Sequence, residues 1–530
     1  MTKNFDVIIV GMGPSGLVLA GLLANYGIKV GLFERNESTV NEPRAVSIDD
    51  ESLRILQSFS MHLSVLKNVS QNYGSHYYDA KGKLFLKVEP NSRENGFFKR
   101  NAFDQPTFEN TLRKHLANKK NIKLNFSHTL VSIKNDTNRV VASFEDSKGL
   151  KKSFFGRYLV GCDGGQSTVR GLIGAVMKGS TFNQRWLVVD ICKTRNFFRH
   201  TQVYCNPKRP SITLPGPNGI RRYEFKLNDK ERSEELRDDF IRKLMVSVGA
   251  DGQAKIRRAQ VYQFHALISS IWRKNSVFIA GDAAHLSPPF AGQGMNSGIR
   301  DVGNLGWKLA LAIKRPKSKK ILETYFLERK DHCWALINLA IRMGRIMMPK
   351  SSFGSFFNAS LFRLIKLNKT MLNYVSQMKY RPKPKISKGI VFFHGKETRN
   401  EKKIIGTLFP QPLVQDIKGA EFYLDDVLGN KFSLVCYVKH YKTYIRLEKY
   451  LNKFSKTYKV VFLLHQSCII FPSRHEVVRD SNNLLDKTHP KVPEDSIFLI
   501  RPDKLVSAIY KKNNLHYLSD LLNNNEIFSF

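Results

Sequence analysis

The sequence of 530 residues predicts an α/β fold, with a sheet-based α+β domain inserted into its first domain and a separate C-terminal domain. Three observations support this prediction. A strand, a glycine-rich turn, a helix and a second strand follow one another within residues 5–34. Segments typical of strands alternate with turns between residues 180 and 265. Further strand-like runs follow a proline-rich linker that begins at residue 381.

The first segment is typical of a parallel β–α–β unit. Residues 5–10 are an apolar run rich in β-branched side chains, which favours a strand. A helix is expected over 17–26, ending at Gly27, and a second strand over 29–34. The connection between two such strands should be right-handed. The first domain is expected over 1–180 and should continue through one helix and three strand segments, at 103–117, 122–135, 139–146 and 154–160.

The pattern changes after about residue 180. Over 181–270, short strands alternate with turns such as Pro215–Gly219, which predicts an inserted sheet-based domain that holds the substrate. The first domain should resume over 271–380 and end in a helical region. Its elements are expected to be a buried strand, a long helix and mostly helical chain, at 277–280, 294–313 and 318–379.

A charged, extended linker is expected at 381–395, because each proline in Arg381–Lys385 disfavours helical geometry at the residue before it. Residues 396–530 should then form a separate C-terminal domain. Strand-like runs predict that this domain is also α/β, with strands near 432–438, 459–464 and 496–501.

The chain is strongly basic, with 85 Lys and Arg against 45 Asp and Glu and a formal net charge of +40. The excess is spread along the whole chain. Two interpretations therefore stay open: a generally basic protein, or one with a surface that binds polyanions or a membrane. The helical stretch 334–348 leaves a similar choice between a core helix and a basic amphipathic membrane contact. The hydrophobic content of 42% excludes disordered and collagen-like classes.

Cysteine usage indicates a reducing compartment. The six cysteines are scattered and form no C-x-x-C pair, so neither a zinc site nor a dithiol redox site is expected: Cys162, Cys192, Cys205, Cys333, Cys436 and Cys468. The N-terminus lacks a signal-peptide pattern, and no run of about 18 apolar residues is present. A cytoplasmic protein is therefore expected.

A G-x-G-x-x-G motif made by Gly11, Gly13 and Gly16 joins the first strand to the first helix, and Glu34 ends the next strand. This context is the fingerprint of a dinucleotide site. The first glycine permits a tight turn, the second lets a pyrophosphate approach the backbone, and the third lets helix and strand pack closely. A carboxylate at position 34 can accept hydrogen bonds from ribose hydroxyls. The motif alone does not distinguish NAD from FAD.

Two later segments favour FAD. RYLVGCDGGQSTVR (157–170) and SVFIAGDAAH (276–285) each end a strand in a turn that contains glycine and aspartate. In the second turn, Asp282 can bind a ribityl hydroxyl. Gly292 and Gly294 can let a flat ring lie against bare backbone, at the positive end of the helix that follows.

These segments resemble the three signatures of the group A flavoprotein aromatic hydroxylases, which share the para-hydroxybenzoate hydroxylase fold. The third match is the longest, VFIAGDAAHLSPPFAGQGMNSGIRDVGNLGWKLA. Within this family, PRAVSIDDESLRILQ (43–57) and LETYFLERKDH (322–332) are similar to 3-(3-hydroxyphenyl)propionate hydroxylases and phenol hydroxylase-like relatives. FLIRPDKLVSAIY (498–510) extends the similarity past the linker, where the family carries a thioredoxin-like domain without redox cysteines.

The resemblance implies a Rossmann-like FAD-binding domain, FAD as the bound cofactor, and NADH or NADPH as a transient electron donor. It also implies that the flavin reacts with O₂ to form a C4a-hydroperoxide, which hydroxylates a phenolic substrate. The choice of nicotinamide cofactor and the identity of the aromatic substrate stay open, as do a homodimer and a peripheral membrane contact. No specific nucleic acid is expected as a partner.

Carried over residue by residue, the resemblance implies a set of cofactor-binding positions. Asp163 belongs to a motif that the family links to both FAD and the nicotinamide cofactor, although it also suits a turn-stabilising role. The implied cofactor-binding residues are Gly11, Gly13, Pro14, Ser15, Gly16, Glu34, Arg35, Arg44, Gln105, Asp163, Gly281, Asp282, Pro289, Gly292, Gly294, Met295 and Asn296.

A phenol is activated by deprotonation, so a base or proton relay is expected near the substrate. His265 and Tyr223 are the candidates, although both also suit buried packing positions on strands of the inserted domain. His285 is better interpreted as a structural partner of the FAD-binding loop. An acidic substrate would need a cation, for which three arginines are available: Arg185, Arg221 and Arg222.

Two other functions stay open. One is a different flavoprotein oxidoreductase on the same scaffold, a halogenase or a reductase. The W-x-W-x-I-P signature of such halogenases is absent, because no two of the four tryptophans are two residues apart. The other is a basic, non-enzymatic protein that retains FAD. Its binding to a polyanion would depend steeply on salt.

Overall fold

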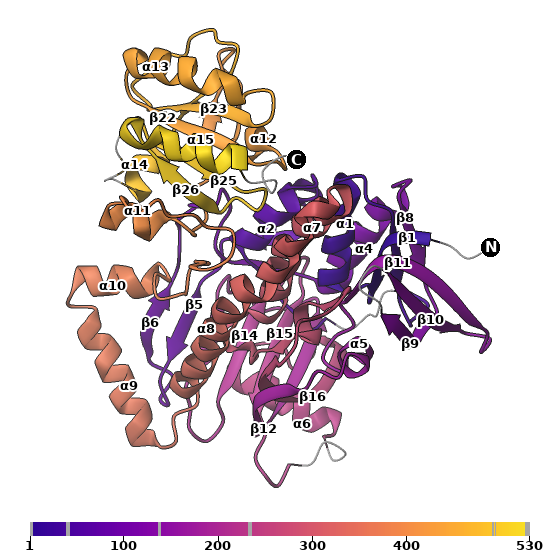
Figure 1. Ribbon diagram of the computed structural model, residues 1–530. Helices are drawn as coiled ribbons and strands as arrows, with labels where there is room; N and C mark the ends of the chain where they lie inside the picture. Colours follow the sequence, from indigo (N-terminus) through magenta and orange to yellow (C-terminus); the bar gives the residue numbers. More distant parts are fainter. Residues whose placement is uncertain are drawn as a thin grey trace.

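The computed structural model describes residues 4–38, 43–135, 139–231, 236–489, 492 and 494–524. Its described strands form three large sheets and one small one. Figure 1 shows the C-terminal domain, in orange and yellow, at one end of the molecule and the second large sheet toward the other end. Within these residues, none of the helices combines the length and hydrophobicity needed to span a bilayer.

The first large sheet has the order β17-β18-β11-β1-β2-β8, with β10 and β9 continuing from β11. Its central strands β18, β11, β1, β2 and β8 are parallel neighbours, so their carboxyl ends meet at one edge. The strands are β1 (Asn4–Val10), β2 (Val30–Phe33), β8 (Ile122–Asn125), β9 (His128–Asn135), β10 (Val140–Asp146), β11 (Lys151–Gly161), β17 (Arg273–Lys274) and β18 (Val277–Ile279).

The expected β–α–β unit is confirmed, with helix α1 (Pro14–Asn25) between β1 and β2. The helix begins three residues earlier than the apolar pattern predicts, because Pro14 occupies its first turn, where the fixed φ of proline already suits a helix. Helix α7 (Gly294–Lys314) packs against α1 and is buried along most of its length. The other helices of this region are α2 (Asp50–Gln57), α3 (His62–Leu66), α4 (Gln105–Ala117), α5 (Thr168–Leu172) and α8 (Thr324–Met347).

The second large sheet, ordered β19-β16-β12-β15-β14-β13-β5-β6, contains the predicted inserted domain. Three of its strands lie outside the predicted limits of 181–270: β5 and β6, from residues 75–88, and β19, from residues 285–286. Its elements are β5 (Ser75–Tyr78), β6 (Leu84–Val88), β12 (Met177–Cys192), β13 (Thr201–Tyr204), β14 (Ser211–Pro215), β15 (Arg221–Lys226), α6 (Asp238–Val248), β16 (Lys255–Ser269) and β19 (His285–Leu286). A small sheet of β3 (Ser47–Ile48), β7 (Asn101–Phe103) and β4 (Val69–Gln71) lies earlier in the chain.

The predicted helical region 318–379 is confirmed. A 3₁₀ segment (Pro316–Glu323) and α8 are followed by α9 (Ser352–Ile365) and α10 (Lys369–Ser376). Residues 334–348, for which the sequence left a membrane contact open, belong to α8, whose Leu336, Ile337 and Ala340 are buried. This part of the chain is therefore mainly a core helix.

The C-terminal sheet has the order β21-β20-β24-β23-β22-β25-β26. Parallel strands β22 and β23 flank α13, and the antiparallel pair β25–β26 is followed by α15, as in a thioredoxin-like domain. The elements are α11 (Arg399–Ile404), β20 (Leu413–Gln415), β21 (Glu421–Tyr423), α12 (Leu424–Leu428), β22 (Ser433–Val438), α13 (Tyr441–Leu451), β23 (Lys459–Leu464), β24 (Glu476–Asp480), α14 (Leu484–Thr488), β25 (Ile497–Ile500), β26 (Val506–Tyr510) and α15 (Leu515–Asn524). All six cysteines are unpaired.

Candidate active site

A cavity of about 440 Å³ lies where the carboxyl ends of the first sheet meet one face of the second. Its size is typical of small-molecule and cofactor sites. Most of the cofactor-binding residues that the sequence implies line this one cavity: Gly11, Gly13, Pro14, Ser15, Glu34, Arg35, Arg44, Gln105, Asp163, Asp282, Pro289, Gly292, Gly294 and Met295. Three turns that lie far apart in the sequence therefore converge on one site.

The glycine motif is shaped as a dinucleotide site requires. A Cβ atom on Gly11, whose φ is +101°, would lie 2.4 Å from the carbonyl oxygen of Cys162, and one on Gly16 would lie 2.0 Å from that of Gly11. A Cβ atom on Gly13 would meet no atom within 4 Å and would enter the cavity. Gly11 and Gly16 therefore serve close packing, whereas Gly13 leaves open the space that a pyrophosphate needs at the start of α1.

Glu34 stabilises the same turn. Its Oε2 accepts a hydrogen bond from the backbone N–H of Met12 (2.9 Å), and its Oε1 accepts one from the side chain of Asn36 (2.7 Å). The carboxylate still lines the cavity, so it remains available to a ribose.

The two aspartate turns contribute differently. Asp163 accepts hydrogen bonds from Ser167 Oγ (2.5 Å) and the backbone N–H of Val169 (3.0 Å), so it stabilises its own turn while lining the cavity. Asp282 makes no hydrogen bond or ion pair within the described chain, and its side chain also lines the cavity. Burial raises the pKa of Asp282 against the opposing effects of His285 and Arg44. Its unpaired oxygens suit the hydroxyls of a ribityl chain.

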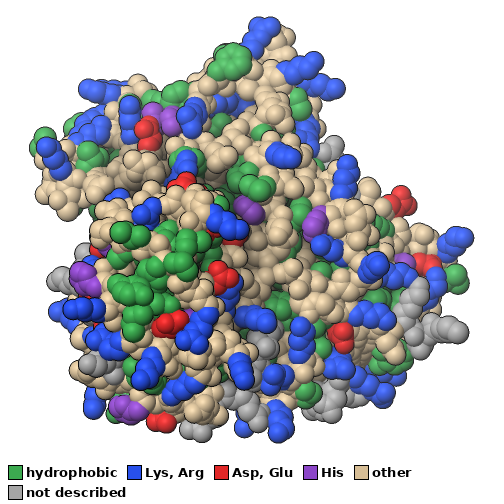
Figure 2. All heavy atoms as spheres, turned by 90° about the horizontal axis from the view of Figure 1, so that it is seen from above, with side chains coloured by type: hydrophobic (Ala, Val, Ile, Leu, Met, Phe, Trp, Pro, Cys, Tyr) green, Lys and Arg blue, Asp and Glu red, His purple; other side chains and the backbone are tan. Residues whose placement is uncertain are grey.

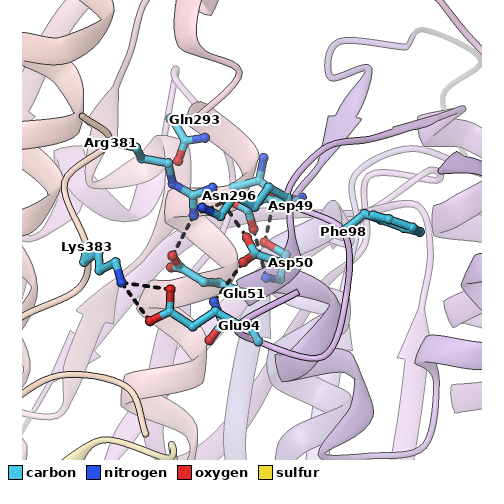
Figure 3. Close-up of polar contacts among 12 residues, drawn as sticks. Asp49, Asp50, Glu51, Glu94, Phe98, Gln293, Asn296, Arg381 and Lys383 are labelled. Atoms are coloured by element: carbon cyan, nitrogen blue, oxygen red, sulfur yellow. Dashed lines mark hydrogen bonds and ion pairs between the residues drawn. The ribbon is translucent and has the colours of Figure 1, made fainter. Parts of the chain in front are cut away.

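Behind the loop that begins at Pro289, a buried polar group holds the backbone in place. Asn296, which is fully buried, donates to the carbonyl oxygens of Gly292 (2.8 Å) and Ser47 (3.0 Å) and accepts from Ser52 Oγ (2.8 Å). Figure 3 shows Asn296 and Gln293 beside the acidic residues 49–51 and Arg381. Asn296 therefore positions the loop and does not line the cavity.

Two other predicted residues also lie behind the lining. Gly16 packs against the turn, and a Cβ atom on Gly281 would lie 2.6 Å from Ser15 Oγ. Gln105 accepts from the backbone N–H groups of Arg44 (3.0 Å) and Ala45 (2.8 Å). Close packing and hydrogen bonds thus connect the three turns into one frame. The residues present fit FAD, because bare backbone, a free carboxylate and a helix N-terminus line one continuous space.

The second sheet supplies the other wall of the cavity. Strand alternation brings one face of β15, β14, β13 and β5 to it, and the register places these side chains in two cross-strand rows. The first row is Glu224, Ile212, Val203 and Tyr77, and the second is Arg222, Leu214, Thr201 and Ser75.

The structure does not bring the two candidate bases to this wall. Tyr223 alternates to the opposite face of β15, where its hydroxyl donates to Asp251 (2.7 Å) and its ring is fully buried. His265 lies on β16, its Nδ1 is 2.9 Å from Thr181 Oγ1, and it does not line the cavity. Tyr223 is therefore a buried packing residue, whereas His265 is half-buried and bonds to a neighbouring strand.

Glu224, next to Tyr223, faces the cavity instead. Only 5% of its surface is exposed, and burial raises its pKa to about 7, opposed by Arg222 and reinforced by Asp190. Within the described chain its nearest cation is Arg222, at 4.0 Å. The alternation of side chains along RRYEF (221–225) could have identified Glu224, because residues 222 and 224 lie on one face of the strand and residue 223 lies on the other.

The three candidate arginines also have other partners. Arg222 pairs with Asp190 (2.7 Å) and donates to the carbonyl oxygen of Arg44 (2.8 Å). Arg221 is buried on the opposite face, and Arg185 donates to the carbonyl oxygen of Asp229. None of the three offers an unpaired guanidinium to a ligand.

Arg100, which the sequence did not single out, lines the cavity with its guanidinium 4.3 Å from the centre of the Tyr73 ring. It donates to Ser75 Oγ and has no acidic partner within the described residues. The Tyr73 hydroxyl and Thr201 Oγ1 are buried, and no protein atom of the described chain bonds to them. Arg100 is thus a cavity-lining cation without an acidic partner in the described chain, and it lies in a lining with two hydroxyls to which no described protein atom bonds.

His285 is part of the structural frame. Its Nε2 lies 2.6 Å from Asp301 Oδ2, which also accepts from the backbone N–H of Gly281 (3.1 Å). Burial opposes a charge on both groups, but His285 and Arg329 hold the pKa of Asp301 below its usual range. The pair therefore ties the Gly281 turn to α7.

One described cluster has the composition of a metal site: His76, Glu89 and His200, behind the cavity wall. The backbone N–H of Gly74 donates to His200 Nδ1 (2.8 Å), so Nε2 carries the proton of the neutral ring. That nitrogen then points a proton toward Glu89 and offers no lone pair to a metal. Hydrogen bonding explains this cluster.

Comparison with known proteins agrees with this geometry. A family model described as FAD binding domain matches residues 4–340, and one described as HcaD C-terminal domain matches residues 406–525. The 3-(3-hydroxy-phenyl)propionate/3-hydroxycinnamic acid hydroxylase of Mycolicibacterium gilvum (strain PYR-GCK) is 33% identical over 511 residues, 95% of this chain and 89% of the relative. A protein of the same name from Burkholderia cenocepacia (strain HI2424) is 35% identical over 432 residues, 81% of this chain and 79% of the relative.

Solved structures show the same fold. The flavin-dependent monooxygenase PieE, in complex with FAD and substrate, has a TM-score of 0.79 at 17% identity and covers 98% of both chains. Aklavinone-11 hydroxylase, in a ternary complex with FAD and aklavinone, has a TM-score of 0.75 at 18% identity and covers 100% of both chains. Together with the family matches and the relatives above 30% identity, these findings show that the chain belongs to the FAD-dependent aromatic hydroxylases.

Proposed function

We propose that this hydroxylase acts on a phenol that carries a carboxylate side chain, of the kind named for its relatives, 3-(3-hydroxyphenyl)propionate or 3-hydroxycinnamate. The observation that carries the proposal is that Arg100 and Glu224 both line the cavity that also contains the FAD-binding turns. The guanidinium of Arg100 suits a carboxylate, and the carboxylate of Glu224 suits a phenolic hydroxyl.

The cofactor would be held by the residues of the three turns. Gly13 and Ser15 would face the pyrophosphate, Asp282 the ribityl chain, and Gly292 to Met295 the ring. When bound, FAD supplies electron transfer from NADH or NADPH and the activation of O₂. The protein supplies orientation and a site that excludes water.

Arg100 is the proposed carboxylate-binding residue. Its guanidinium has no acidic partner in the described chain, whereas Asp190 already neutralises Arg222. Stacking on Tyr73 and the bond to Ser75 hold the planar group in one orientation. A guanidinium held in this way can bind a carboxylate through two parallel hydrogen bonds.

Glu224 is the proposed base. Its carboxylate would accept the proton of the phenol hydroxyl, and the resulting phenolate ring would be more electron-rich and easier to hydroxylate. A base whose pKa lies near 7 combines a deprotonated form at neutral pH with useful basicity. The unpaired hydroxyls of Tyr73 and Thr201 are further hydrogen-bonding groups for the substrate.

A substrate panel tests the proposal. We would compare 3-(3-hydroxyphenyl)propionate and 3-hydroxycinnamate with 3-methylphenol, which lacks the carboxylate. Substrate-stimulated oxidation of NADH and NADPH would be measured together with the hydroxylated product, its label from ¹⁸O₂, and hydrogen peroxide. The carboxylated phenols should give labelled catechols with kcat/KM on the order of a hundredfold above that of 3-methylphenol, the value of one charge-assisted pair.

Equal kcat/KM values for all three phenols would contradict the carboxylate-binding role. A halogenated or hydrogenated product, with no oxygen from ¹⁸O₂, would instead favour a halogenase or reductase on this scaffold. Peroxide without product would mean that none of the three phenols is the substrate.

A further inference from the structure

Helix α9 has two faces with different surroundings. One face packs on the second sheet, where Phe362 lies 5.8 Å from Phe85 between ring centres and Ser355 Oγ donates to the carbonyl oxygen of Cys205 (2.9 Å). Ala359 on that face is fully buried. Figure 1 shows α9 and α10 along the outer margin of the molecule.

The other face exposes large apolar side chains at helical spacing. Phe353, Phe356 and Phe357 are 78%, 63% and 60% exposed, and the same face continues along α9. The remaining exposed apolar residues of α9, of the turn after it and of α10 are Leu361, Leu364, Leu367, Met371 and Tyr374. Eight large exposed apolar side chains on two consecutive helices and the turn between them are typical of an interaction site, whereas exposed apolar residues that occur singly need no explanation.

The segment that carries this surface has charges of one sign, although Arg363 of α9 pairs with Asp79 from outside the segment (2.7 Å). Residues 332–396 contain twelve Lys or Arg and no Asp or Glu. At the ends of the two helices, Lys350, Lys366 and Lys369 are exposed and have no acidic partner within the described chain. Elsewhere, too, Figure 2 shows many Lys and Arg and few Asp and Glu on the face seen from above.

The apolar side chains and the lysines together distinguish between two partners for the apolar face, a second copy of the chain and a membrane. A symmetric dimer would bring the same surface against itself and would place like-charged lysines opposite one another. A membrane with anionic headgroups accepts both features, because aromatic side chains enter the interface while lysines attract the phosphates. The charge therefore favours a lipid surface.

We propose that α9 and α10 form a peripheral docking surface for anionic phospholipid bilayers, which we call the α9–α10 surface. Phe353, Phe356 and Phe357 supply the apolar contact, and Lys350, Lys366 and Lys369 supply the electrostatic one. The proposal is independent of the substrate, because these side chains do not line the active-site cavity.

The test is sedimentation of the full-length, FAD-loaded protein with vesicles of mixed phosphatidylglycerol and phosphatidylcholine, and with vesicles of phosphatidylcholine alone. The protein should pellet with the first and remain in solution with the second. A Lys366→Gln/Lys369→Gln variant should bind roughly thirtyfold more weakly, at roughly fivefold per lysine. A Phe353→Ser/Phe356→Ser/Phe357→Ser variant should lose affinity on the order of a hundredfold.

Matched controls change exposed side chains elsewhere. Phe197 is 88% exposed on another loop, and Lys119 and Lys120 are exposed after α4. Phe197→Ser and Lys119→Gln/Lys120→Gln should each bind vesicles as the wild type does. Flavin absorbance and turnover, unchanged in every variant, would show that the proteins are folded.

Two results would overturn the proposal. One is binding that does not depend on anionic lipid or on the α9–α10 surface. The other is a dimer, seen by light scattering during size-exclusion chromatography, that the triple serine variant converts to a monomer. That result would assign the apolar face to a second copy of the chain.

Discussion

Tyr223 and Glu224 are neighbours in the sequence, yet their side chains lie on opposite faces of β15. Successive residues of a strand alternate between faces, so a shift of one position separates the core from the cavity. The sequence drew attention to Tyr223 for its residue type. Only the register of β15 with β14 and β12 shows which of the two faces the cavity.

The role of Glu224 as a base predicts a pH dependence. Because the base must be deprotonated, kcat/KM of the wild type should rise with pH through about 7, the pKa of Glu224. Glu224→Gln should lower kcat by roughly a hundredfold or more and remove this limb of the profile. Steady-state rates of product formation between pH 5.5 and about 9 check both expectations. A variant that keeps the limb would exclude Glu224 as the base.

The same group should affect stability. Burial raises the pKa of Glu224 from its ordinary value of 4.5 to about 7, so the folded protein binds the proton more tightly than the unfolded chain. Its effect is therefore destabilising, and it grows as pH rises from about 4.5 to about 7. Relative to the wild type, Glu224→Gln should gain up to about 3 kcal/mol of unfolding free energy between pH 5 and pH 8. Urea unfolding at both pH values measures this gain, and an equal difference at both would contradict it.

Arg100 predicts a change in specificity. Arg100→Met should raise KM for 3-(3-hydroxyphenyl)propionate on the order of a hundredfold, because it removes a cavity-lining guanidinium that has no acidic partner in the described chain. The KM for 3-methylphenol should stay within about threefold, since that phenol has no carboxylate to lose its partner. An equal rise of KM for both phenols would show that Arg100 only supports the fold.

At the scale of single elements, the start of α1 has the strongest link between sequence and function. Pro14 in the first turn and glycines at 11, 13 and 16 place the helix N-terminus at the edge of the sheet. Local backbone geometry determines this arrangement, and so it could be predicted. The beginning of α7 is similar, with Gly292 at φ +62° ahead of the helix.

A substitution at Gly13 tests the role of the start of α1 directly. Its φ of −75° suits any residue, and a Cβ atom there would enter the cavity without touching the protein. Gly13→Ala should therefore fold but bind FAD at least roughly tenfold more weakly, because the methyl group occupies the space of the pyrophosphate. Gly171→Ala is the control, since a Cβ atom there also meets nothing and lies outside the cavity. Flavin titration followed by fluorescence measures both affinities, and equal affinities would exclude the pyrophosphate from Gly13.

For the whole molecule, a buried ion network joins the C-terminal domain to the rest. Arg501 binds Glu328 of α8 (2.8 Å), and Lys308 of α7 binds the same carboxylate (2.7 Å), with all three side chains fully buried. Burial lowers the pKa of Lys308 to about 8, opposed by Glu328. Any other docking of the two parts would leave buried charges unpaired, so the network favours this one orientation.

Arg501→Met should therefore be strongly destabilising, by about 3–5 kcal/mol, since it leaves the fully buried carboxylate of Glu328 and the partly buried one of Asp503 with one cation fewer. Arg474→Met is the control, because Arg474 is exposed and its pair with Glu448 should contribute less than about 1 kcal/mol. Urea unfolding compares the two variants. A loss below about 1 kcal/mol in Arg501→Met would contradict the docking role.

Much of the fold could be predicted, and part of the site. The β–α–β unit, the long helix α7 and three C-terminal strands follow from local patterns of hydrophobicity, glycine and proline. The placement of β5 and β6 beside β13 could not be predicted, because residues 75–88 pair with a strand more than a hundred residues later. Ser75 and Tyr77 therefore enter the cavity from a segment that no local pattern connects to it.

The amino-acid pattern alone determined where backbone must come close to a cofactor, because glycine, proline and aspartate at fixed offsets restrict the turn in which they occur. Three-dimensional packing decided which charged groups remain unpaired in the cavity. Arg222 has an acidic partner in Asp190 and Arg100 has none within the described chain, although both are arginines near the same wall. That difference arises from long-range strand register and burial, which set the distances between charges and the cost of leaving them without water.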